Sequence, residues 1–162
     1  MTRERFTELV AREQEGLRRF LRALCGDAFE ADDIAQDALV KAYVASDRYV
    51  ERFRFSTWLF RIAYNCWLDR QRKRSPVRTA LTHPDAAAVP DSVRADAGFE
   101  YQGLYAALSA LSEQEKTSLL LFYMEDKPVR EIAEIMDTRE GTVKSWLSRG
   151  REHLKKHIGN ER

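Results

Sequence analysis

Apolar residues in the first third of the chain recur at three- and four-residue steps, the spacing of one face of an α-helix. The spacing predicts a first helix over 6–24, ending near Gly26, and a second over 34–43. A charged and aromatic loop, 47–55, precedes a third predicted helix, for which Ser56 is the expected N-cap. These three helices form the first of two predicted helical lobes.

The third predicted helix carries apolar residues on two faces. The expected buried stripe consists of Trp58, Leu59, Ile62, Ala63 and Cys66, with Cys66 as a small core residue rather than a reactive thiol. Opposite lie Phe60, Tyr64 and Trp67, which run into a basic segment, 70–74. Aromatic stripes usually pack against a neighbouring helix or a partner. Beside basic residues, however, such a face also suits the stacking of unpaired bases, and it is a candidate exposed surface.

The final third of the chain predicts a second helical lobe. Leucine spacing indicates a helix over 104–111, and Ser112 and Glu115 form a capping-box motif that opens a helix reaching to residue 124. Pro128 stands where a short helix starts, and Thr138 is the expected cap of a longer one. Two helices joined by a tight turn predict a helix-turn-helix. An ordinary helical hairpin with a basic surface is the alternative. The candidate DNA-contacting residues of this second helix are Arg139, Thr142, Lys144, Ser145, Ser148, Arg149 and Arg151.

The stretch 74–98 differs from both lobes. It contains three of the four prolines, and no aromatic residue occurs between Trp67 and Phe99. Such a segment is a poor core former. We therefore expect an all-α protein of two small helical domains, 1–75 and 99–162, joined by a flexible linker, 76–98, with the helix-turn-helix in the second domain. Low glycine and proline content agrees with a helical fold (7 and 4 of 162 residues).

Charge is balanced overall but unevenly distributed. The formal net charge is +1, although 33% of the residues are charged. Five acidic residues and no basic one occur over 27–37, whereas 61–74 and 139–162 each carry a local balance of +4. One acidic and two basic patches indicate separate surfaces for separate partners. The alternative for each patch is an ordinary solvated helix face.

Several classes of function find little support in the sequence. The longest apolar run has six residues, far short of a membrane span, and the mixed-charge start has no signal-peptide pattern. Cys25 and Cys66 show neither disulfide nor zinc spacing, and His153 and His157 lack the glutamate of a zinc-binding helix. We expect a cytoplasmic protein without cofactor, metal or catalytic site.

Three segments resemble those of the extracytoplasmic-function (ECF) sigma factors of bacterial RNA polymerase. The segment 31–38 (ADDIAQDA) is similar to their helix that grips the polymerase, and 55–74, which begins FSTWLFRIAYN, to the helix that melts and reads the minus-ten element. The segment 141–152 (GTVKSWLSRGRE) is similar to the helix that reads the minus-thirty-five element. The order of the three segments around a short linker is typical of this family.

The resemblance implies partners and site residues. The partners are bacterial core polymerase (the β′ coiled coil and the β flap), promoter DNA and an anti-sigma factor, which the aromatic face or the cleft between the lobes would receive. The implied polymerase-binding residues are Asp32, Asp33, Gln36 and Asp37. The implied minus-ten residues are Arg52, Phe53, Arg61, Asn65, Arg72 and Lys73, and the minus-thirty-five residues are those of the second helix of the helix-turn-helix.

A different class remains open from the sequence: an autonomous helix-turn-helix regulator whose first lobe senses a signal or dimerises. It accounts for the C-terminal segment but leaves the acidic helix and the aromatic-basic helix without a role. It predicts a dimer and a palindromic binding site.

Overall fold

The structure, a computed structural model, describes residues 1–50, 54–81 and 102–159. Every regular element within these ranges is helical, as the sequence predicts. The elements are α1 (Arg3–Cys25), α2 (Ala28–Val44), the 3-10 turn η1 (Ser46–Arg48), α3 (Phe55–Leu81), α5 (Gln102–Ser109), α6 (Glu113–Leu119), the π-helical turn η4 (Leu120–Met124), α7 (Val129–Ile135) and α8 (Glu140–Gly159). We call α1–α3 the N-terminal region and α5–α8 the C-terminal region.

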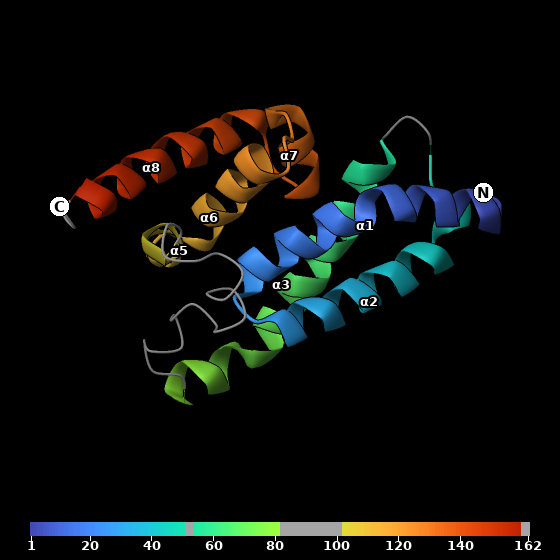
Figure 1. The fold of residues 1–162 in the computed structure, drawn as a ribbon, viewed down its shortest axis with the longest axis horizontal. Coiled ribbons are helices and arrows are strands. Elements are labelled where there is room, and N and C mark those ends of the chain that lie inside the picture. The colour runs from blue at the N-terminus through green and yellow to red at the C-terminus, as the bar shows by residue number, and fades with distance from the viewer. Residues whose placement is uncertain (51–53, 82–101, 160–162) are drawn as a thin grey trace.

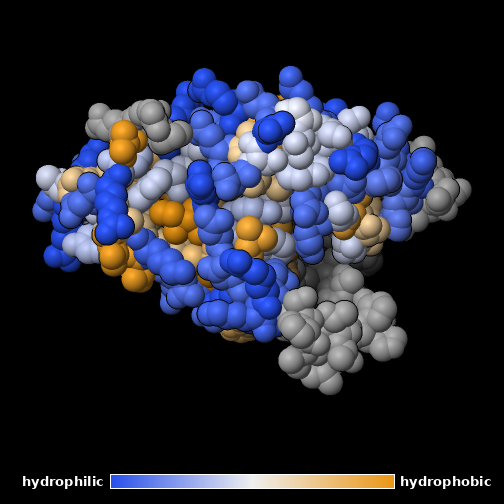
Figure 2. All heavy atoms as spheres, turned by 180° about the vertical axis from the view of Figure 1, so that it is seen from behind, coloured by the Kyte–Doolittle hydropathy of each residue, from blue (hydrophilic) through white to orange (hydrophobic). Residues whose placement is uncertain are grey.

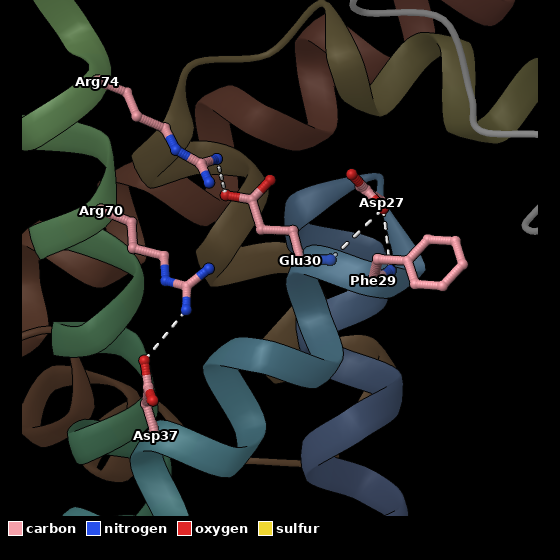
Figure 3. Close-up of polar contacts among 6 residues, drawn as sticks. All are labelled: Asp27, Phe29, Glu30, Asp37, Arg70 and Arg74. Carbon is pink, nitrogen blue, oxygen red and sulfur yellow. Dashed lines mark hydrogen bonds and ion pairs between the residues drawn. The ribbon is translucent and has the colours of Figure 1, made fainter.

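A sharp reversal between α1 and α2 places these two helices side by side (Figure 1). Gly26 adopts the left-handed conformation (φ 72°) and its N–H donates to the carbonyl of Arg22, which ends α1 where the sequence predicts. The next residue, Asp27, caps α2 by accepting hydrogen bonds from the N–H groups of Phe29 and Glu30 (Figure 3). Because of this cap, α2 begins six residues before the predicted start.

Helix α3 completes the N-terminal region and packs along α2. It begins at Phe55, so the prediction that Ser56 is its N-cap is wrong; Ser56 lies inside the first turn, where its hydroxyl contacts Lys127. At its other end α3 continues to Leu81, past the predicted start of the linker at 76. The rest of that linker and the predicted loop residues 51–53 lie outside the described residues, and the domain boundaries stay predictions.

The C-terminal region contains the predicted helix-turn-helix. The capping box of Ser112 and Glu115 is present and starts α6. The helical run reaches residue 124 as expected, but its last five residues form the π-turn η4 rather than α-helix. Pro128 occupies the N-cap position of α7, and Asp137 adopts a positive φ of 53° in the turn before α8. Helix α8 begins two residues after Thr138, the expected cap.

The aromatic face of α3 is not exposed. Phe60, Tyr64 and Trp67 are 1%, 5% and 2% exposed, so the prediction of an open stacking surface is wrong and the packing alternative is confirmed. Leu59, Ala63 and Cys66 on the other stripe are also buried, whereas Trp58 and Ile62 are half-buried. A helix buried on two faces needs a second neighbour, and α7 of the C-terminal region supplies it.

Candidate functional site

Helix α2 presents a mixed acidic and apolar surface. Asp33 and Gln36 are exposed, and neither makes a hydrogen bond or ion pair with another described residue. On the same face lie three exposed apolar side chains, Phe29, Val40 and Val44, at 85%, 63% and 76% exposure. We call these five residues the α2 surface. Nothing in the described part of the chain covers the apolar members, which indicates a protein partner.

The other two predicted polymerase-binding residues, Asp32 and Asp37, form ion pairs within the chain. A carboxylate oxygen of Asp32 lies 3.0 Å from a guanidinium nitrogen of Arg18, and one of Asp37 lies 3.1 Å from Arg70 (Figure 3). Of the four predicted acidic and polar positions, Asp33 and Gln36 are therefore the ones left fully available to a partner. Sequence analysis missed the apolar members, although Phe29, Asp33, Gln36, Val40 and Val44 repeat at helical spacing.

The basic end of α3 has two distinct roles. Arg74 contacts the buried carboxylate of Glu30, and Arg70 contacts Asp37, so both arginines fasten α3 to α2 (Figure 3). Arg72 contacts Asp69 within the helix but remains 78% exposed. The arginines at 70 and 74 therefore contribute to folding, which reduces the basic patch that the sequence suggests.

The predicted minus-ten residues of α3 share an exposed face. Arg61, Asn65 and Arg72 are exposed and recur at positions that bring them to one side of the helix; we call them the α3 face. Lys73 is exposed beside it. The structure does not describe Arg52 and Phe53, the two predicted residues in the preceding loop.

The α7–α8 pair exposes polar residues on its second helix. Val143 and Leu147 pack into the core with Ile132 and Ile135. Ser145, Ser148 and Arg149 point to the opposite side, are exposed, and form what we call the α8 face. This placement suits entry into a DNA major groove, where serine hydroxyls and an arginine guanidinium reach base edges and phosphates.

The other predicted residues of this helix flank the α8 face. Lys144 and Arg139 are exposed, whereas Thr142 is half-buried. Arg151 is exposed but partly engaged: its Nε donates a hydrogen bond of 2.7 Å to the hydroxyl of Tyr123. That bond directs Arg151 toward η4, so Arg151 fastens α8 to η4 rather than contributing to the α8 face.

Neither cysteine has the environment of a reactive thiol. Burial raises the pKa of Cys25 to about 12, and the nearby carboxylate of Glu30 adds to the shift. Burial also raises the pKa of Cys66. A thiol in such surroundings stays protonated at neutral pH and is a weak nucleophile.

Among the described residues, no three His, Cys, Asp or Glu side chains cluster where they could hold a metal. No described helix has the length and apolar character that crossing a membrane requires. The displayed face of the molecule is mostly hydrophilic, with separate apolar patches between charged side chains (Figure 2).

The fold and surfaces define a two-region, all-helical protein with a C-terminal helix-turn-helix. The family model for sigma-70 region 2 matches residues 9–77, and that for sigma-70 region 4 matches 101–154. The chain belongs to the ECF sigma factors of bacterial RNA polymerase. As a family these are transcription initiation factors rather than enzymes, and they bind core polymerase and promoter DNA. An autonomous regulator is not favoured.

Relatives and solved structures agree with this assignment. The ECF RNA polymerase sigma factor SigW of Bacillus subtilis is 29% identical over 94% of this chain and 88% of its own length. The RNA polymerase sigma-H factor of Pseudomonas aeruginosa is 30% identical over 94% and 86%. The sigma factor RpoE of Bartonella quintana, solved in complex with the anti-sigma factor NepR, superposes with a TM-score of 0.80 at 25% identity, over 98% of this chain and 99% of that one.

Proposed function

We propose that this sigma factor uses its three surfaces for three successive tasks: the α2 surface binds core polymerase, the α8 face reads the minus-thirty-five element, and the α3 face binds the minus-ten element. The observation that carries the proposal is their separation onto three helices, each exposed away from its own core. The residues outside these faces, among them Arg70 and Arg74, hold the helices that position them.

The α2 surface fits a partner that is basic in the middle and apolar at the ends. Asp33 and Gln36 lie between Phe29 on one side and Val40 and Val44 on the other. The family resemblance supports the β′ coiled coil of polymerase as the proposed partner. The carboxylate orients the encounter, and burial of the apolar side chains provides most of the affinity.

The α8 face fits the major groove of the minus-thirty-five element. We assign to the exposed Arg149 a bidentate contact with guanine, worth about 1–3 kcal/mol of discrimination, with the exposed Ser145 and Ser148 beside it. Lys144 and Arg139 lie where they can neutralise phosphates. Contact of the C-terminal region with the polymerase β flap is part of the same proposal.

The α3 face suits the melted minus-ten strand. Arg61 and Arg72 supply positive charge along the helix, and the amide of Asn65 between them can hydrogen-bond the edge of an unpaired base. Lys73 is also exposed and adds positive charge next to Arg72. Because each DNA-binding surface is small, we expect the free protein to bind promoter DNA weakly and the holoenzyme to bind it firmly.

We also propose that an anti-sigma factor binds this chain, as NepR binds the sigma factor RpoE of Bartonella quintana. The support is the match of that sigma factor to both regions of this chain at once, at a TM-score of 0.80. The proposed partner binds across the two regions and keeps them from reaching polymerase.

The experiment that tests the proposed function is run-off transcription with bacterial core polymerase on pooled promoter fragments from the source genome. Discrete transcripts that appear only with the protein would support it and reveal the promoter sequence. Specific DNA binding by the protein alone, without transcripts, would contradict it and favour an autonomous regulator.

A further inference from the structure

Helix α8 approaches α6 very closely at Gly150, and the two helices lie side by side (Figure 1). Gly150 is buried inside α8 and directly follows Arg149 of the α8 face. A Cβ atom added at this glycine would lie 2.9 Å from Cδ1 and 3.3 Å from Cγ of Leu119, and 3.4 Å from Cβ of Glu115. Real Cβ atoms essentially never come within 3.0 Å of another heavy atom. The backbone of α8 is therefore closer to α6 than a residue with a side chain would allow.

Leu119 has no free space into which it could turn. It is the last residue of α6 and is 3% exposed, and its neighbours Ser118 and Leu120 are 0% and 4% exposed. Protein interiors are packed densely enough that a displaced side chain meets other atoms. An added methyl group at position 150 therefore pushes α8 away from α6.

Another glycine of α8 has no such neighbour. Gly141 is exposed, and a Cβ atom added there would meet nothing within 4 Å. Glycine is less favourable in a helix than every residue except proline, because its backbone loses the most freedom. At Gly150 this unfavourable choice has a specific physical use, which is the close approach of two helices.

A side-chain contact next to Gly150 holds α8 on η4. Nε of Arg151 donates a hydrogen bond of 2.7 Å to the Tyr123 hydroxyl, and the guanidinium carbon lies 5.8 Å from the centre of that ring. In η4 the N–H of Glu125 donates to the carbonyl of Leu120, five residues earlier, which is the π-helical pattern. The π-turn thus carries the tyrosine that Arg151 contacts.

A second side-chain contact holds α8 on α6. Nδ1 of His153 lies 3.0 Å from Oε1 of Glu115, the residue whose Cβ is also close to Gly150. The arginine and histidine contacts resist separation of α8, but both are made by long side chains that can follow a small displacement. The glycine, whose backbone lies against Leu119, sets how close the helices come.

The position of Gly150 along α8 makes this distance relevant to DNA recognition. Val143 and Leu147 pack into the core with residues of α7, and Gly150 lies seven residues beyond Val143, or about 10 Å at about 1.5 Å per residue. A push at Gly150 therefore tilts α8 relative to α7. In helix-turn-helix proteins the second helix enters the major groove while the first crosses the backbone, so the angle between them decides which base edges are reached.

We propose that Gly150 is a positioning residue for minus-thirty-five recognition: the close approach of α8 to α6 that it permits sets the angle at which the α8 face enters the major groove. Gly150 faces α6 and acts through Arg149 and the two serines of the α8 face. The proposal rests on the proposed function of that face. The close approach itself rests on the contacts alone.

Three variants of the full-length protein test the close approach. Gly150→Ala adds one carbon against Leu119, Leu119→Val removes one there, and the double variant keeps the total unchanged, which cores tolerate best. Gly141→Ala is the matched control, because it improves helix propensity without a new contact. Circular dichroism checks that all variants retain their helices.

Urea unfolding measures the clash without reference to DNA. Gly141→Ala should raise the unfolding midpoint by roughly 0.2–0.5 M, as glycine-to-alanine substitutions do where the alanine fits. Gly150→Ala should leave the midpoint unchanged or lower it. In the Leu119→Val background, however, Gly150→Ala should raise the midpoint about as much as Gly141→Ala does.

Transcription by the holoenzyme measures the positioning. The probe is the promoter fragment that gives the strongest run-off signal with wild-type protein, together with its single-base variants in the minus-thirty-five and minus-ten elements. A bidentate arginine–guanine contact discriminates by about 5-fold to about 150-fold and depends on alignment. Gly150→Ala should lower minus-thirty-five discrimination at least about threefold and leave minus-ten discrimination unchanged. Leu119→Val and the double variant should keep the wild-type values.

The outcomes separate this inference from the proposed function. An equal rise of the midpoint in Gly150→Ala and Gly141→Ala would overturn the close approach. Unchanged minus-thirty-five discrimination in Gly150→Ala, or an equal loss at both promoter elements, would overturn the positioning role. No transcripts from wild type, with the unfolding series as expected, would support the close approach but overturn the proposed function, and the positioning role with it.

Discussion

Arg70 donates a hydrogen bond of 3.1 Å to Asp37, so a residue from the basic end of α3 neutralises one of the acids proposed to bind polymerase. Arg18 does the same to Asp32. Two acids of the acidic patch that is evident in the sequence are thus neutralised by ion pairs within the folded chain. Asp33 carries the negative charge that remains available at the centre of the α2 surface.

Reversing that charge should abolish transcription without unfolding the protein. In Asp33→Arg, a positive side chain meets a basic partner, and like charges at an interface cost several kcal/mol. Because Asp33 is exposed and has no ion pair with another described residue, stability should change by no more than about 0.5 kcal/mol. Run-off transcription and thermal unfolding measure the two effects.

The matched control is Glu8→Arg, which makes the same charge change on an exposed position of α1, outside the three surfaces. It loses a surface ion pair with Arg5, 3.3 Å long, and should stay active. Equal loss in both variants would mean that overall charge, rather than the α2 surface, governs assembly. An active Asp33→Arg protein would remove that residue from the proposed interface.

Arg149 and Arg151 should behave differently although both are basic and exposed. Arg149→Ala should cost about 1–3 kcal/mol against the preferred promoter and relax the base preference at one minus-thirty-five position. Arg151→Ala should lower stability through its lost bond to Tyr123, with little change in base preference. Transcription by the holoenzyme on promoters with single-base changes distinguishes the two roles. If base preference changes only in Arg151→Ala, Arg151 rather than Arg149 reads the base.

Local signals in the sequence predict much of this fold. The end of α1 at Gly26, the capping box of Ser112 and Glu115, and the helix-turn-helix each depend on residues close together in the chain. An N-cap at Ser56 would start the helix at residue 57, two residues after the observed start at Phe55, and the Ser56 hydroxyl instead contacts Lys127. The π-turn at η4 has no local signal of this kind.

Contacts between the regions explain what sequence reasoning missed. Phe60, Tyr64 and Trp67 read as an exposed aromatic face because periodicity reveals an apolar stripe but not its neighbour. Likewise, Arg70 and Asp37 are 33 positions apart, so their mutual neutralisation depends on how α2 and α3 pack. The outward side of α8 was easier to predict than the α3 face, because the short helix-turn-helix determines which side of its second helix is exposed; the DNA contacts of those residues stay predictions.

The contact of Arg74 with Glu30 should contribute measurably to stability. Glu30 is 8% exposed and its carboxylate would lose a charged partner in Arg74→Gln, at a cost of about 1–2 kcal/mol. A double-mutant cycle with Glu30→Gln, measured by urea unfolding, isolates the pairwise term. Additive effects of the two substitutions would show that the pair provides no net coupling between α2 and α3.

Both thiols should be protected in the folded protein. Burial raises the pKa of Cys25 to about 12 and also raises that of Cys66, so little thiolate exists at neutral pH. We expect very slow reaction with a disulfide reagent in the native state and rapid reaction of both thiols in denaturant. Fast native modification, with loss of transcription, would instead indicate a redox response.

Acid should weaken the C-terminal region through Glu115. Burial acts to raise the pKa of Glu115, but hydrogen bonds from His153 and from the backbone of Ser112 outweigh it and hold that pKa below its usual value. A carboxylate with a lowered pKa contributes stability that is present above the unfolded-state pKa and is lost as pH falls through the folded-state pKa. The stability advantage of wild type over Glu115→Gln should therefore shrink as the pH falls below about 4.5. Glutamine keeps the capping box without titrating, which makes it the appropriate reference.

Urea unfolding of both proteins at a series of pH values measures that advantage. Near neutral pH we expect it to be about 0.5–1 kcal/mol, because the 3.0 Å contact joins a buried carboxylate to a half-exposed histidine ring. The ring lies on α8 and the carboxylate on α6, so the contact fastens the helix that carries the α8 face to the helix behind it. An advantage that stays constant down to about pH 3.5 would show that Glu115 acts through the capping box alone. The α8 face would then be held in place by Val143 and Leu147 in the core, without help from this pair.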